Sequence, residues 1–92
     1  MGFEWDAAKA KTNVRSHGVR FEESRAVFDG PYAITIADDE ADPSEERFVS
    51  IGMGALGRVL IVVYTYRDDN IRTISARVAV ARERAEYEAG LP

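Results

Sequence analysis

Residues 59–67, VLIVVYTYR, form the longest β-prone run of this chain. β-branched and aromatic residues favour strands, and a strand that is apolar on both faces is buried on both sides within a sheet. A turn signal, Asp68-Asp69-Asn70, follows this run, and a second strand-like run, IRTISAR, occupies residues 71–77. We therefore expect a hairpin whose first strand, over about 58–67, is the central strand of a sheet.

Local patterns on both sides of this hairpin predict further strands and helices. Asp6 is a suitable N-cap, Gly18 is placed to end the helix that Asp6 begins, and Gly54-Ala55-Leu56-Gly57 predicts the turn before the central strand. The expected elements are a short leading strand at 3–5, helices over about 7–17 and 21–28, strands at 32–37 and 46–53, and a last helix over about 78–89. The predicted fold class is α+β, with two N-terminal helices, an antiparallel meander of about four strands and a C-terminal helix.

Composition is typical of one soluble globular domain. The 92 residues are 46% hydrophobic and 30% charged, and this length predicts a single domain over 1–92. The absence of cysteine excludes disulfides and zinc–thiolate sites, and it fits a cytoplasmic protein. We expect no membrane-spanning segment and no signal peptide, because the longest apolar run has only about eight residues.

Charge is distributed unevenly along the chain. The net charge is −4, which argues against general nucleic-acid binding. Residues 1–46 contain 11 Asp/Glu and 5 Lys/Arg, a net of −6, whereas residues 47–92 contain 5 Asp/Glu and 7 arginines, a net of +2. A local positive field can attract an anion although the whole molecule is acidic. The alternative is a solvated surface of mixed charge.

Arg67 and Arg77 end the two apolar runs and suggest an anion site. Arginine is rarely buried without a partner, and its planar set of five donors suits phosphate. Each arginine could instead form an ion pair with a neighbouring aspartate or a helix glutamate. A three-residue loop at 68–70 would pair Arg67 with Ile71, whereas a four-residue loop would pair it with Arg72, itself a candidate for substrate binding. The sequence does not choose between these registers.

Five other residues are candidates for catalysis or substrate binding. His17 is the only histidine and a candidate acid, and the alternative role for it is an interaction with a helix C-terminus. Glu46 is the favoured general base, and Arg47 beside it points to the opposite face of a strand. Arg84 and Tyr87 on the last helix are candidates for substrate binding, with core packing as the alternative for Tyr87. No metal cluster or phosphate loop is present, so we expect no metal and no cofactor.

The chain resembles the BrnT family of toxins over residues 3–88. No single block is diagnostic, but the ordered set with its spacing is specific. The matching residues are Phe3-Glu4-Trp5-Asp6, Lys9, Asn13, His17-Gly18-Val19, Phe21-Glu22-Glu23, Val27-Phe28, Glu45-Glu46-Arg47, Ile51-Gly52, Gly57-Arg58, Val63-Tyr64-Thr65, Arg67, Ile71-Arg72, Ile74-Ser75-Ala76-Arg77, Glu83-Arg84 and Tyr87-Glu88.

This resemblance implies a ribonuclease toxin of a type II toxin–antitoxin module, with a compact fold like that of RelE-type toxins. It also implies a BrnA-type antitoxin that binds DNA, represses the shared operon and holds the toxin inactive in a dimer of toxin–antitoxin pairs. The arginines of the family pattern fall on Arg67 and Arg77, and its His-Gly-Val falls on His17, Gly18 and Val19.

Two functions follow as hypotheses. The first is a metal-independent endoribonuclease, because the RNA 2′-hydroxyl supplies a nucleophile next to the scissile phosphate. Arg67 and Arg77 would hold that phosphate, with Glu46 as base and His17 as acid. The second is a binding module that docks an antitoxin without catalysis. The second gains from departures from the family pattern: Ser16 and Val78 stand where lysines are common, Arg20 replaces a capping hydroxyl, and 38–44 lacks a histidine.

Overall fold

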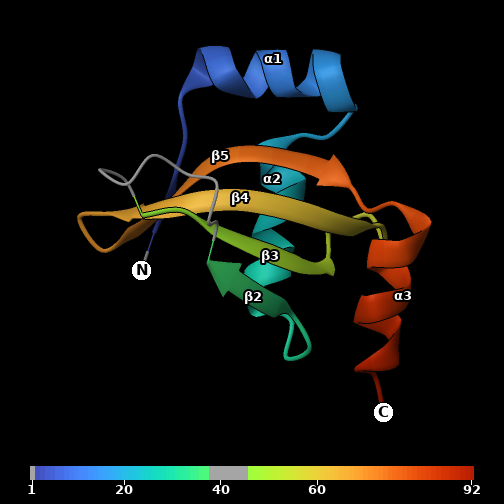
Figure 1. The fold of residues 1–92 in the computed structure, drawn as a ribbon. Coiled ribbons are helices and arrows are strands. Elements are labelled where there is room, and N and C mark those ends of the chain that lie inside the picture. Colours follow the sequence, from blue (N-terminus) through green and yellow to red (C-terminus); the bar gives the residue numbers. More distant parts are fainter. Residues whose placement is uncertain (1, 38–45) are drawn as a thin grey trace.

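The computed structural model describes residues 2–37 and 46–92 and contains three helices, a 3₁₀ helix and one five-stranded sheet. The strand order is β1-β5-β4-β3-β2 (Figure 1). In chain order, the elements are β1 (Phe3–Glu4), α1 (Ala7–His17), α2 (Phe21–Ser24), η1 (Arg25–Asp29), β2 (Ile34–Ala37), β3 (Phe48–Met53), β4 (Val59–Arg67), β5 (Asn70–Val78) and α3 (Ala81–Ala89).

The sheet confirms the prediction for the apolar run. β4 lies at the centre, between β5 and β3, and both of these neighbours are antiparallel to it. β2 to β5 form the expected antiparallel meander. The leading strand β1 is added parallel to β5, with Phe3 opposite Ile71. The α+β class is therefore confirmed, and the sheet has one strand more than the meander.

The first helix has the predicted ends. The Asp6 side chain accepts a hydrogen bond from the backbone N–H of Lys9 at 2.9 Å, which is a standard N-cap interaction. At the other end Gly18 takes the left-handed conformation, with φ of 67°, and its N–H bonds to the Val14 carbonyl. A residue with a Cβ atom would be strained in this conformation, so glycine suits the position.

The other two helices are shorter than predicted, for identifiable reasons. The carbonyl of Glu23 accepts the N–H of Ala55, at 3.1 Å, from the turn between β3 and β4. This carbonyl then serves the turn instead of continuing an α-helix, and the chain proceeds as the 3₁₀ helix η1. Ala79 donates to the Val59 carbonyl at 2.9 Å, which extends the β4–β5 ladder, so α3 begins at Ala81 and not near 78.

The two faces of the sheet are covered differently. One face, which we call the α2 face, packs Leu60, Val62 and Tyr64 of β4 against α2, η1 and the segment that precedes them. The other face, which we call the arginine face, is covered at one end by α3, where Tyr87 packs against Ile51, Val59 and Ile61. Figure 1 shows α2 behind the sheet and α3 at the end where β5 finishes. Within the described part of the chain, no helix is long and apolar enough to cross a membrane.

The side chain of Asn13 forms hydrogen bonds that a further strand would otherwise form with the edge of β5. Its amide donates to the carbonyls of Val19 and Ala76, at 2.9 and 2.8 Å, and its oxygen accepts the N–H of Ala76 at 3.1 Å. β1 pairs with β5 only at 71 and 72. The side chain of Asn13, which is 5% exposed, therefore satisfies an edge that the two-residue strand β1 leaves open.

Candidate nucleic-acid interface

A β-bulge places arginines from both strands of the central hairpin on one face of the sheet. The register pairs Val63 with Ser75 and Tyr64 with Thr73, so Ile74 is an extra residue in β5. Side chains alternate along a strand, so Arg72 and Arg77, five residues apart, would point to opposite faces without this extra residue. With the bulge, both lie on the arginine face.

Three arginines surround Thr65 at the end of the sheet that α3 does not cover. Arg72 is directly opposite Thr65 in β5. Arg47 precedes Phe48, which is opposite Tyr64, so continuing the ladder by one position puts Arg47 opposite Thr65 on the other side. Arg67 is two residues further along β4 on the same face. Strand spacing puts these three backbones within roughly 5–7 Å of that of Thr65. We call Arg47, Arg67 and Arg72 the arginine cluster.

The members of the arginine cluster differ in their surroundings. Arg72 forms an ion pair with Glu4 at 3.2 Å, across the β1–β5 pairing. Arg47 is half-buried and engaged with neighbours. Arg67 is exposed and forms no ion pair with the described residues. The cluster therefore contains two arginines that interact with neighbours, Arg47 and Arg72, and one exposed guanidinium, that of Arg67, which a ligand can reach.

The turn that carries Arg67 differs from both predicted alternatives. Asp68 and Asp69 form a two-residue turn, with φ of 50° and 66°, and Arg67 pairs with Asn70. Positive φ at both central residues defines the tight turn that matches strand twist, and aspartate tolerates this conformation. The expected three- and four-residue loops are therefore wrong, because the two aspartates complete the turn by themselves.

Arg77 lies away from the cluster and binds a carboxylate. It is opposite Ile61, six residues from Arg67 along β4, which is about 20 Å of strand. Its guanidinium donates two hydrogen bonds to Glu83 of α3, both at 2.8 Å, and Glu83 also accepts the N–H of Val80 at 2.9 Å. These contacts, led by the Arg77 hydrogen bonds, lower the pKa of Glu83 to about 2. The expectation that Arg67 and Arg77 hold one phosphate is corrected, because two arginine side chains cannot span this separation.

His17 and Glu46 are not brought together. His17 is exposed at the end of α1 and lines a shallow hollow with Ser16, Ile74 and Ser75 beside the edge of β5. Glu46 is exposed just before β3, and its carbonyl accepts the hydroxyl of Thr65 at 2.6 Å. Glu46 thus borders the arginine cluster, whereas His17 lies beyond β5.

The two candidates on α3, Tyr87 and Arg84, both contact other side chains of the protein. Tyr87 is 5% exposed and belongs to the small core between α3 and the sheet. Arg84 is exposed and pairs with Glu88 one helical turn away, at 3.8 Å. Tyr87 is therefore a core residue, which was the alternative to substrate binding, while Arg84 is accessible at the surface.

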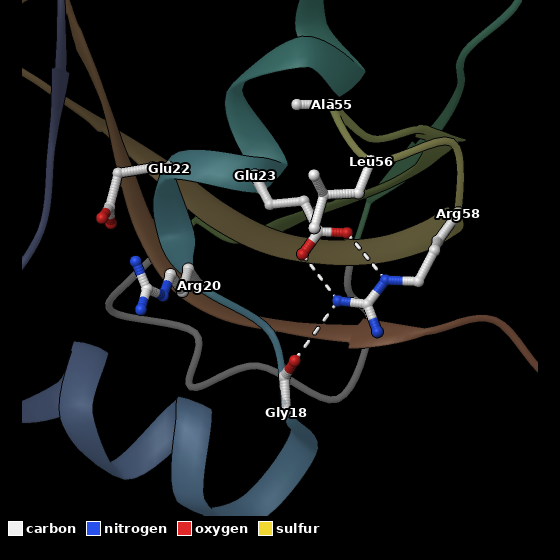
Figure 2. A pocket seen from close by; sticks show the side chains of 7 residues that line it. All are labelled: Gly18, Arg20, Glu22, Glu23, Ala55, Leu56 and Arg58. Atoms are coloured by element: carbon white, nitrogen blue, oxygen red, sulfur yellow. Dashed lines mark hydrogen bonds and ion pairs between the residues drawn. The ribbon is translucent and has the colours of Figure 1, made fainter.

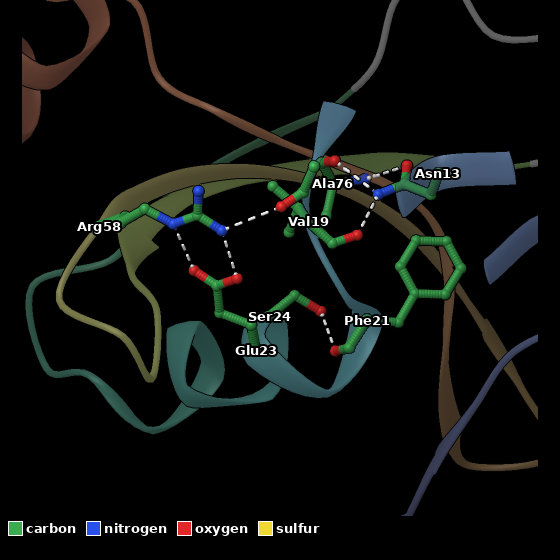
Figure 3. A network of polar contacts seen from close by, with 8 residues as sticks. Asn13, Val19, Phe21, Glu23, Ser24, Arg58 and Ala76 are labelled. Atoms are coloured by element: carbon green, nitrogen blue, oxygen red, sulfur yellow. Dashed lines mark hydrogen bonds and ion pairs between the residues drawn. The ribbon is translucent and has the colours of Figure 1, made fainter. Parts of the chain in front are cut away.

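Sequence reasoning missed an ion pair beneath the turn between β3 and β4, in which the carboxylate is buried and the guanidinium is partly exposed. Arg58 donates to both carboxylate oxygens of Glu23, at 2.9 and 2.6 Å, and to the carbonyl of Gly18 at 3.2 Å (Figure 2). The Glu23 side chain is only 5% exposed, and this pairing raises the pKa of Arg58. Arg58 thus bonds the carbonyl of Gly18, and Asn13 bonds the carbonyl of the next residue, Val19. Figure 3 shows Arg58 paired with Glu23, and Asn13 between Val19 and Ala76. No local sequence pattern predicts the contact between Arg58 and Glu23, because its partners are 35 residues apart.

The hollow in Figure 2 has a volume of about 420 Å³ and is lined by residues of both charges. Arg20 and Arg58 contribute two positive charges, and Glu22 and Glu23 contribute two negative charges. This balance does not favour a polyanion, so the arginine cluster is the better candidate for RNA. Among residues 2–37 and 46–92, no group of three or more His, Cys, Asp or Glu side chains is placed to hold a metal ion.

Fold and site together define a small α+β protein with an arginine-bearing sheet face. A family model described as the ribonuclease toxin BrnT of type II toxin–antitoxin systems matches residues 5–83. The chain therefore belongs to the BrnT family of ribonuclease toxins, and membership of a type II system implies an antitoxin partner.

A solved structure supports this assignment. The chain is similar to the crystal structure, at 1.1 Å resolution, of the Brucella abortus ribonuclease toxin BrnT. The TM-score is 0.68 and the identity 26%, over 87% of this chain and 97% of that one. No curated protein matches the chain. The likeness to RelE-type toxins stays a prediction.

Proposed function

We propose that the chain is an endoribonuclease whose arginine face binds the RNA backbone. The observation that carries this proposal is the arrangement of Arg47, Arg67 and Arg72 around Thr65 at the end of the sheet that α3 does not cover. Arginine binds phosphate through paired hydrogen bonds as well as charge. Arg77, about 20 Å away along the strand, would contact a different phosphate of the same RNA strand.

The proposed reaction uses the RNA as its own nucleophile. The 2′-oxygen forms a bond to the adjacent phosphorus, and the bond from phosphorus to the 5′-oxygen breaks. One proton leaves the 2′-hydroxyl, and one is delivered to the departing 5′-oxygen. Arginines of the cluster would stabilise the charge that develops on the phosphoryl oxygens. This route does not require a metal.

Glu46, whose backbone borders the cluster, is the proposed base, and its exposed side chain would reach the phosphate around the end of the sheet, because alternation directs it to the face opposite Arg47. His17, the acid expected from the sequence, lies beyond β5. Glu46 is in line with β3, so the two residues are more than two strand spacings apart, which is more than about 10 Å. An acid and a base must each lie within hydrogen-bond reach of the reacting phosphate, so His17 does not serve as the acid for a phosphate held at the cluster. Arg84 is an additional proposed contact for RNA, from the surface of α3. Tyr87 would contribute by fixing α3 in position, since it is buried.

The experiment is cleavage of end-labelled single-stranded RNA by the purified protein in excess EDTA. The proposal predicts fragments that carry a 2′,3′-cyclic phosphate and a 5′-hydroxyl. A chimeric substrate with a single ribonucleotide in DNA should be cut only after that ribonucleotide. Intact RNA in EDTA, together with cleavage after magnesium is added, would contradict the metal-independent route.

We further propose that a BrnA-type DNA-binding antitoxin in the cytoplasm neutralises the toxin as a dimer of toxin–antitoxin pairs. Type II membership supports an antitoxin. The four-residue strand β2 is at the outer edge of the sheet, where a partner strand can add. Co-purification with the protein encoded by the adjacent gene, followed by mass measurement, tests this stoichiometry.

The second candidate function is an antitoxin-docking module without catalysis. It is favoured by the ion pair between Arg77 and Glu83, which gives Arg77 a structural role, and by the net charge of −4. Induction without the antitoxin separates the candidates. A ribonuclease toxin should arrest growth and lose this effect on Arg67→Ala, whereas undisturbed growth with abundant folded protein supports the docking module.

A further inference from the structure

A hollow on the α2 face lies behind the arginine cluster, at the same end of the sheet. Its volume is about 490 Å³, and its walls include the rings of Phe3, Phe28, Tyr64 and Tyr66. Tyr66 stands between Thr65 and Arg67 in β4, so alternation points it away from the arginine face. The hollow and the cluster are therefore separated only by the sheet itself.

The rings of this hollow are packed edge to face, and one remains accessible. Phe28 and Tyr64 are 4.8 Å apart at 89°, and Tyr64 and Tyr66 are 5.8 Å apart at 83°. Tyr66 is 51% exposed, in contrast to Tyr64 at 3%. Neighbouring rings hold Tyr66 on one side, so its exposed surface is available to a flat ligand.

Polar groups line the same hollow. The hydroxyls of Thr35 and Ser50 are 2.9 Å apart, and Ser50 donates to the Tyr64 hydroxyl at 3.0 Å. Asp29 contributes an exposed carboxylate at the wall, with no ion pair to the described residues. Arg25 stacks over Phe3, with its guanidinium carbon 4.7 Å from the ring centre. The hollow thus offers an aromatic surface, hydroxyl groups, an acceptor and a nearby cation.

We infer that this hollow binds a nucleobase of the RNA, one that carries an exocyclic amino group. The inference rests on the proposed ribonuclease function and adds a base-binding site to it. Aromatic side chains bind bases by stacking, and the Asp29 carboxylate can accept a hydrogen bond from the amino group of adenine, cytosine or guanine, whereas uracil has no amino group and offers only its ring N3–H. An RNA strand that passes around this end of the sheet would place phosphates at the cluster and a base in the hollow.

The test is equilibrium binding of short 2′-fluoro RNA homopolymers, measured by fluorescence anisotropy. These oligonucleotides lack the 2′-hydroxyl and cannot be cut by the proposed route, so binding is measured independently of cleavage. Tyr66→Ala should weaken binding of the adenine and cytosine oligomers by about fivefold or more, as expected for one lost stacking contact. Tyr66→Phe, which keeps the ring, should retain most of the affinity. Asp29→Asn should reduce the preference for these oligomers over the uracil oligomer.

The matched control is Tyr32→Ala. Tyr32 is an exposed tyrosine, 43% accessible, that does not line the hollow, and its loss should leave affinity unchanged. Equal affinities of wild type and Tyr66→Ala for the RNA oligomers would overturn the inference. The inference would also fail if Tyr66→Ala bound RNA as wild type does but lost affinity for an antitoxin. If wild type binds as described and cuts no RNA, the ribonuclease proposal fails and the base site stands. If wild type cuts RNA and Tyr66→Ala binds RNA as tightly as wild type, the ribonuclease proposal stands and the base site fails.

Discussion

At the scale of single residues, the pair formed by Arg77 and Glu83 shows how position decides the role of an arginine. Arg77 lies near the end of β5, as Arg67 ends β4, but α3 supplies a carboxylate that binds Arg77 through two hydrogen bonds. Glu83 raises the pKa of Arg77 and has its own pKa lowered to about 2. A carboxylate of such low pKa is a weak base at neutral pH, so Glu83 orients Arg77 and does not accept protons.

This pair predicts a pH-dependent contribution to stability. Because the pKa of Glu83 is lower in the folded chain than the ordinary value of 4.5, the contribution is complete above about pH 4.5 and is lost as pH falls toward 2. Glu83→Gln should lower the free energy of unfolding at pH 7 by about 1 kcal/mol, a value reduced for the exposure of Arg77. Urea unfolding at several pH values checks this, with Glu86→Gln as control. A difference between wild type and Glu83→Gln that persists undiminished near pH 2 contradicts the account.

Residue types alone pointed to part of the candidate site. The runs that end in Arg67 and Arg77 indicated an anion site, and Arg47 and Arg72 were candidates, because arginines in an apolar setting are few. The partners of these arginines could not be predicted. Glu83 reaches Arg77 only because the strand extends through Ala79 before the helix starts, and the pairing of Arg58 with Glu23 joins residues 35 positions apart.

At the scale of elements, alternation predicted the strands but not their irregularities. The apolar run at 59–67 was correctly placed at the centre, since few alternatives bury both of its faces. The extra residue at Ile74 leaves no mark in the hydrophobic pattern, yet it decides that Arg77 shares a face with Arg72. The tight turn was also missed, because Asp68-Asp69-Asn70 is compatible with several loop lengths.

The turn gives a prediction about register. Replacing Asp68 by Asn and Asp69 by Gly should raise the free energy of unfolding by about 0.5 kcal/mol, because these residues suit positive φ better than aspartate. Urea unfolding at high salt, where the lost charges are screened, measures the effect. Destabilisation would indicate a longer loop and a different pairing for Arg67.

Asn13 gives a second prediction at this scale. Asn13→Ala removes three hydrogen bonds and leaves buried backbone groups at Val19 and Ala76 unsatisfied, which should cost roughly 2–4 kcal/mol of stability. Asn13→Asp should be no better at pH 7, because its carboxylate would face two carbonyl oxygens. Thermal unfolding checks both, with the exposed Thr12→Ala as control. Stability of Asn13→Ala equal to that of the control would show that water closes the edge of β5.

At the scale of the whole molecule, an acidic protein carries four arginines on one face of its sheet. The net charge of −4 repels RNA at a distance, while the arginine cluster attracts it at short range. Binding should therefore depend on salt through the few phosphates that are contacted. For three arginines, the slope of log affinity against log salt should be about −2 on single strands, and Arg67→Ala should make it less negative by about 0.7. A slope near zero would indicate that binding does not use the arginine cluster.

The central claim is that the arginine face carries the ribonuclease site. Single-turnover cleavage rates of wild type, Arg67→Ala and Arg15→Ala on one labelled RNA test it most directly. Arg15 is an exposed arginine on α1, away from the arginine face. The account predicts a loss of about tenfold or more for Arg67→Ala, as for one transition-state contact worth roughly 1.4 kcal/mol, and an unchanged rate for Arg15→Ala. Equal rates for wild type and Arg67→Ala would contradict it.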